Sequence, residues 1–159
     1  MPVFGLNNGM VPIIAYNYGA GHKDRVIKTI KHSVAYGVGI MFVGLLAMHI
    51  FPAQLMRMFD AEESLIAIGA PALETISLSF VFAGFCIVAG SVFQALGNGV
   101  YSMIVSVARQ MCVLLPVAKL LSLSGEVTLI WWAFPIAELA SVLLTSYFLV
   151  RIYRKVICH

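Results

Sequence analysis

Charged side chains are scarce in this sequence of 159 residues: they make up 11% of it, whereas hydrophobic residues make up 61%. Ordinary soluble domains carry roughly a quarter charged residues, so this scarcity excludes a water-soluble globular domain. The mean hydropathy of +0.96 agrees. The net charge of +3 comes without a dense basic stripe, which excludes nucleic acid as a partner. Most of the surface is therefore expected to face membrane lipid.

Cysteine is also rare, and the sequence signals of enzymes are missing. The three cysteines form no C-x-x-C pair, so neither a disulfide framework nor a zinc site is indicated. The four histidines lack metal-ligand spacing, and the sequence has no phosphate-binding glycine loop or catalytic dyad. We therefore expect no metal and no cofactor, and a protein that is not an enzyme.

Long apolar runs are what the sequence does contain. A membrane-spanning helix needs about 20 mostly apolar residues, and five segments meet this requirement, at about 3–20, 33–51, 71–96, 100–121 and 127–150. The stretch from Pro52 to Gly69 is too polar to span, and we expect a loop with an interfacial turn there. Pro71 is expected in the first turn of the third span. The predicted fold class is all-α, a polytopic membrane helix bundle.

Basic residues are concentrated after the first and the fifth span, and this predicts the orientation. The two basic groups are Lys23, Arg25, Lys28 and Lys31, and then Arg151, Arg154 and Lys155. On the opposite side only Arg57 and Lys119 occur. Because basic loops stay in the cytoplasm, we predict a cytoplasmic loop at 21–31, an external loop at 52–68 and a cytoplasmic C-terminus, in a multi-pass protein of the plasma membrane.

Three ionisable residues fall inside the predicted spans, where a charge is costly and commonly functional. Glu74 is expected in the first turn of the third span, as an interfacial acid or as part of a cation site. Arg109 shares a helix face with Ser102, Ser106, Cys112 and Pro116, and Glu138 shares one with Pro135, Ser141 and Thr145, so both faces are expected to point inward. Both charges lie roughly 21 to 23 Å from the turn between their helices. A salt bridge between them is therefore predicted, either as a structural clamp or in transport.

The first span is unusually polar for a helix surrounded by lipid. It contains Pro12, Tyr16 and Asn17 as well as several glycines, which is typical of a helix that lines a cavity. The alternative is close helix packing through Gly5 and Gly9, since small residues at this spacing let two backbones approach.

Several motifs resemble those of multidrug and toxic compound extrusion (MATE) transporters, in the order of that family. Residues 9–21, GMVPIIAYNYGAG, resemble the family's eighth-helix signature, and residues 93–99, FQALGNG, the end of its tenth helix. Arg109-Gln110 with Pro116 resembles the eleventh helix, and residues 131–138, WWAFPIAE, the twelfth.

The resemblance implies a twelve-helix antiporter of two lobes, of which this chain is the second lobe without its first helix. Such transporters export small cationic or aromatic compounds, driven by a transmembrane proton or sodium gradient. The expected partners are membrane lipid and the missing first lobe and seventh helix; a chain that begins almost directly with a span is expected to be a piece of a larger transporter.

By the same resemblance, the cavity-lining residues are Pro12, Tyr16, Asn17 and Gln94, and the intramembrane charge or cation-coupling candidates are Glu74, Arg109 and Glu138. Two other functions are open. One is a non-transporting membrane scaffold that packs against a partner, and the other is a relative of lipid-linked sugar flippases, against which the Gly-Ala-Gly and Gln-Ala-Leu-Gly motifs argue.

Overall fold

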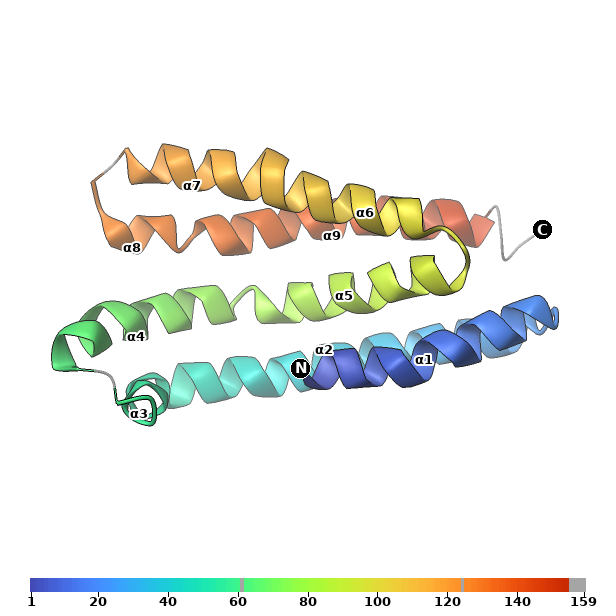
Figure 1. The fold of residues 1–159 in the computed structure, drawn as a ribbon, viewed down its shortest axis with the longest axis horizontal. Helices are drawn as coiled ribbons and strands as arrows, with labels where there is room; N and C mark the ends of the chain where they lie inside the picture. The colour runs from blue at the N-terminus through green and yellow to red at the C-terminus, as the bar shows by residue number, and fades with distance from the viewer. Residues whose placement is uncertain (61, 124, 155–159) are drawn as a thin grey trace.

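The fold is a bundle of helices that run side by side along one long axis (Figure 1). A computed structural model describes residues 1–60, 62–123 and 125–154, and in these ranges every regular element is a helix, which confirms the all-α prediction. The elements are α1 (Pro2–Gly19), α2 (Lys23–Ile50), α3 (Pro52–Arg57), α4 (Glu63–Ser77), α5 (Phe80–Ala95), α6 (Gly99–Val107), the π-helix η1 (Ala108–Leu114), α7 (Leu115–Ser122), α8 (Val127–Ile130) and α9 (Ala133–Ile152).

Within the described ranges, three helical segments are long and apolar enough to cross a membrane: α2, the rod from Gly99 to Ser122, and the segment from Val127 to Ile152. The bent pair of α4 and α5 makes a fourth if it is one span. Of the five predicted spans, the structure therefore supports three, or four with the bent pair, although all five segments are mostly helical. The first of them, α1, does not reach the same apolar character because Asn7, Asn8 and Asn17 lie in it.

The connection between α1 and α2 is shorter than predicted. Helix α2 begins at Lys23 rather than near residue 33, so the predicted loop at 21–31 shrinks to a turn in which Gly21 adopts a φ of +74°. Four bases occupy the first turns of α2 instead of a loop. Hydropathy locates the apolar part of a helix, but backbone hydrogen bonds continue through good helix formers such as Lys and Arg, and so the helix extends beyond its apolar part.

The predicted loop between Pro52 and Gly69 is also wrong in most of its length. It contains α3 and the beginning of α4, and Arg57 Nη2 donates to Glu63 Oε1 at 3.2 Å between these two helices. Glu63 lies in the first turn of α4, where an acid is favourable near the helix N-terminus. Pro71 is consequently inside α4 rather than in its first turn, and Glu74 lies in the last turn and a half of that helix.

A bend of 52° separates α4 from α5. Beside it the hydroxyl of Ser77 donates to the carbonyl of Glu74 at 2.8 Å, and the hydroxyl of Ser79 donates to the carbonyl of Ile76 at 2.6 Å. Such side-chain bonds to the preceding turn compete with the helical ladder and bend helices. The bend thus has a local cause in the two serines.

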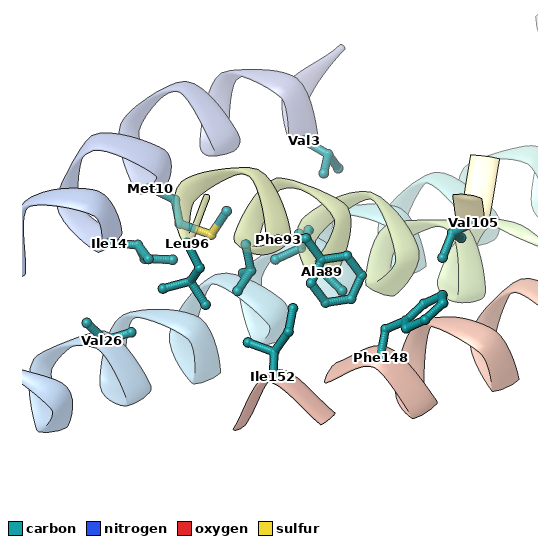
Figure 2. Packing of buried hydrophobic residues seen from close by; sticks show 12 residues of the cluster. Val3, Met10, Ile14, Val26, Ala89, Phe93, Leu96, Val105, Phe148 and Ile152 are labelled. Carbon is teal, nitrogen blue, oxygen red and sulfur yellow. The ribbon is translucent and has the colours of Figure 1, made fainter. Parts of the chain in front are cut away.

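Helix α5 forms the centre of the bundle and packs against α1, α2, α6 and α9. The core around it draws on all of these helices: Phe93 and Val92 of α5 are fully buried in one cluster with Ile14 of α1 and Ile152 of α9, and Figure 2 shows Ile14, Phe93 and Ile152 in it. Where α2 meets α5, a Cβ atom on Gly84 would lie 3.1 Å from the carbonyl oxygen of Gly37. The close approach of these two helices therefore requires glycine.

Gly5 and Gly9, by contrast, have open space where a Cβ would stand. The prediction that they allow tight helix packing is wrong within this chain, because the α1 face that carries them does not touch another described helix at those positions.

The turns alternate between the two ends of the bundle. The α1–α2 turn, the α5–α6 turn and the C-terminal end of α9 lie at one end, and α3 and the α7–α8 turn lie at the other (Figure 1). Both basic groups, as far as they are described, therefore lie at the same end. The count of Lys and Arg requires both groups on one side of the membrane, and the fold agrees with this. That this side is the cytoplasmic one stays a prediction.

Candidate functional site

The site is built around an ion pair between two membrane-spanning segments. Arg109 Nη1 donates to Glu138 Oε1 at 2.7 Å, and the two side chains are 34% and 11% exposed. Arg109 belongs to η1 and Glu138 to α9, which pack against one another. The salt bridge predicted from the turn between the two helices is confirmed. Removing Arg109 would leave the buried carboxylate of Glu138 uncompensated, which is strongly destabilising.

Arg109 lies in a π-helix, which sequence reasoning missed. Residues 108–114 form π turns, and Pro116 follows in the first turn of α7. Proline has no N–H to donate to the preceding turn, and its position just after the polar Arg109-Gln110 pair is the signal for an irregular helix here. Wide turns of this kind are frequent at functional sites.

The π-helix also explains one incorrect prediction. Ser102 and Ser106 line the cavity together with Arg109, as expected, but Cys112 and Pro116 are exposed and do not line it. An α-helical period of 3.6 residues would place all of them on one face, whereas a π turn takes more residues and rotates the following side chains away. On the regular helix α9, the predicted face holds: Pro135, Ser141 and Thr145 are all buried.

A cavity of about 230 Å³ with a partly polar lining lies beside the ion pair, between α5, α6, η1 and α9, and Phe4 of α1 also lines it. Besides Arg109, its polar lining residues are Ser91, Gln94, Ser102, Ser106, Ser141 and Thr145. Gln94 Nε2 donates to Ser102 Oγ at 3.2 Å. Hydroxyls and a guanidinium offer a bound molecule several donors and acceptors inside an otherwise apolar bundle.

The cavity brings together only some of the predicted site residues. Gln94 and Arg109 line it, and Glu138 is connected to it through Arg109. Ser91, Ser141 and Thr145 complete the lining; Ser141 and Thr145 lie one and two turns beyond Glu138 on the face predicted from the sequence.

The predicted site residues of the first span, Pro12, Tyr16 and Asn17, do not line this cavity, although Phe4 of the same span does. Tyr16 is 76% exposed and Pro12 is exposed, so both face outward from α1. Asn17 is buried: its Nδ2 donates to the carbonyl of Ile13 at 2.8 Å, and its Oδ1 has no hydrogen-bond partner in the part of the chain that the structure describes.

Glu74 also lies apart from the cavity. It is exposed on α4, and only its backbone carbonyl is bound, by Ser77. Glu138 differs, because its side chain is buried and its second oxygen, Oε2, has no hydrogen-bond partner among the described residues. Buried polar atoms are nearly always hydrogen-bonded, so an unpartnered one needs an explanation.

An apolar helix bundle that keeps a charged pair and a hydroxyl-lined cavity among its spans has the construction of a membrane transport protein. The MatE family model matches residues 1–120. The chain belongs to the MatE family.

Two multidrug export proteins are similar to this chain in sequence. The multidrug export protein MepA of Staphylococcus haemolyticus is 26% identical over 136 residues, which are 86% of this chain and 30% of that protein. MepA of Staphylococcus aureus is 26% identical over 137 residues, with the same coverage. The chain thus spans about a third of the length of these relatives.

Two solved structures share the fold. The MATE multidrug transporter DinF-BH, solved in complex with a ligand, matches 99% of this chain with a TM-score of 0.86 and 32% identity, and the match covers 35% of that transporter. An inward-facing multidrug resistance transporter of the MATE family and MOP superfamily matches 96% of this chain with a TM-score of 0.86 at 16% identity, over 36% of its own length.

Proposed function

We propose that this chain forms part of one lobe of a secondary antiporter that exports small cationic or aromatic compounds. The observation that carries the proposal is the polar cavity beside the Arg109–Glu138 pair, in a chain of the MatE family. A membrane scaffold would have no need for a charged pair among its spans, because apolar side chains pack there at lower cost.

Export requires a driving ion, and the proposed source is a transmembrane proton or sodium gradient. Glu138 is the preferred coupling acid of this chain, since its unpartnered oxygen is buried next to the cavity helices, whereas Glu74 is exposed on α4. A proton or a cation at Glu138 competes with Arg109 for the carboxylate. Occupancy of the acid would thereby change how firmly η1 is held on α9.

The proposed partners of the chain are the first lobe and the seventh helix of the same transporter. Between α1 and α2 lies an open groove of about 490 Å³, lined by Gly5, Gly9 and Ile13 of α1 and by His32 and Tyr36 of α2. Small residues at a four-residue spacing favour the close approach of another membrane helix. The exposed Tyr16 lies on the same helix and extends this surface.

A chimera tests the proposal directly. This chain replaces the matching third of DinF-BH, and the chimera is expressed in cells that lack their own efflux pumps. We expect lower accumulation of a cationic aromatic dye than in cells that express the chain alone, and loss of this difference when the ion gradients are collapsed. Equal accumulation in both cell lines, at equal membrane expression of the proteins, would favour the scaffold function.

A further inference from the structure

A second, smaller cavity lies at the basic end of the bundle, away from the site described above. It has a volume of about 120 Å³ and is formed where α2 and α9 both approach α5. Its floor consists of Val92, Leu96 and Ile152, which are at most 5% exposed. Lys31 of α2 and Tyr153, the residue directly after α9, also line it, and both are exposed. Figure 2 shows Leu96 and Ile152 within the same packed cluster.

The lining of this groove suits hydrocarbon and not water. Apart from Lys31 and Tyr153, its residues are Ile, Val and Leu. A buried water needs two to four polar partners, which these side chains do not supply. An alkyl chain, in contrast, gains contact with each of them.

The charges at this end of the bundle are mostly positive. Lys31 is exposed and has no acid within salt-bridge distance among the described residues. The described bases at this end of the bundle are Lys23, Arg25, Lys28, Lys31, Arg151 and Arg154, and the acid that lies among them in the sequence is Asp24. A basic surface between membrane helices attracts anionic lipid head groups.

We propose that this groove holds one acyl chain of an anionic phospholipid and that the ammonium group of Lys31 binds the phosphate of the same lipid. Lysine reaches from an apolar helix face to the head-group region with its long side chain, and Tyr153 lines the groove as a residue type that is common at that depth. A zwitterionic lipid fills the groove equally well, but its own cationic group would face the basic end. The proposal rests on this groove and its charges, not on transport.

Photo-crosslinking in nanodiscs tests the proposal with the full chain. The two lipids are phosphatidylglycerol and phosphatidylcholine with the same photoreactive group in the acyl chain, and labelled peptides are identified by mass spectrometry. We expect phosphatidylglycerol to label residues 27–31 and 149–153 above the rest of the surface. In Lys31→Gln this labelling should fall about fivefold, because the lipid in this groove loses the ammonium group that binds its phosphate.

Lys28→Gln is the matched control, because Lys28 is an exposed lysine one turn earlier on α2 that borders the α1–α2 groove instead. It should leave labelling of residues 149–153 unchanged. Equal labelling by both lipids, an equal effect of the two substitutions, or uniform labelling around the bundle would overturn the proposal. A second variant, Leu149→Trp, fills the groove and should abolish labelling there without changing the charge.

Discussion

Arg109 and Glu138 are 29 residues apart in the sequence, yet their side chains meet at 2.7 Å between η1 and α9. The pair joins two neighbouring spans beside the polar cavity. Each charge alone would be costly in the membrane, and each partner offsets that cost for the other. The same two side chains therefore hold η1 on α9 and contribute charge to the cavity.

The first prediction concerns the stability that this pair provides. Arg109→Gln should lower the free energy of unfolding by about 3 kcal/mol, because it leaves the buried carboxylate of Glu138 without its partner. Glu138→Gln should lower it by less, because the side chain of Arg109 is 34% exposed. Unfolding of the purified chain in mixed micelles with increasing denaturing detergent measures the change. The exchanged variant, Arg109→Glu with Glu138→Arg, should recover part of the loss. Two single variants as stable as the wild type would show that the pair does not hold the helices together.

The second prediction concerns the crossing of α2 and α5. Gly84→Ala should destabilise the bundle by about 1 to 3 kcal/mol, because the added methyl meets the Gly37 carbonyl and the side chain of Met41 at 2.9 to 3.2 Å. Gly39→Ala is the control, since a Cβ on Gly39 meets nothing within 4 Å. The same unfolding measurement serves both variants. Equal effects of the two substitutions would contradict the close packing.

The third prediction concerns sidedness. In a background without the three native cysteines, an impermeant thiol reagent applied to intact cells should label a cysteine introduced by Glu63→Cys, and should fail to label one introduced by Lys23→Cys. The reason is that Lys23 lies at the end that carries most of the bases, and Glu63 lies near the opposite end. Strong external labelling at position 23 would reverse the proposed topology.

The sequence predicted the features that follow from the lengths of apolar runs and from the positions of charged residues. The helical class follows from long apolar runs, and the Arg109–Glu138 pair follows from two charges at equal distance from one turn, because helices rise by a constant length per residue. The face of Glu138 was predictable because α9 is regular from Ala133 to Ile152.

The features that the sequence did not predict depend on backbone hydrogen bonds and on neighbouring helices. The polar stretch after Pro52 is helical because helices need internal hydrogen bonds and not apolar side chains. The positions of Cys112 and Pro116 changed with the π turns of η1, which no periodic pattern reveals. Gly37 and Gly84 became recognisable as a crossing point only when α2 and α5 were placed together.

The most direct test of the transport proposal is the rate of dye efflux from proteoliposomes that contain the DinF-BH chimera, measured under an imposed proton gradient and under an imposed sodium gradient. Rates are normalised to folded protein. We predict gradient-dependent efflux that is lost in Glu138→Gln and kept in Glu74→Gln, because Glu138 is buried beside the cavity helices and Glu74 is exposed on α4. Efflux that is independent of both gradients, or an unchanged rate in Glu138→Gln, would contradict the account.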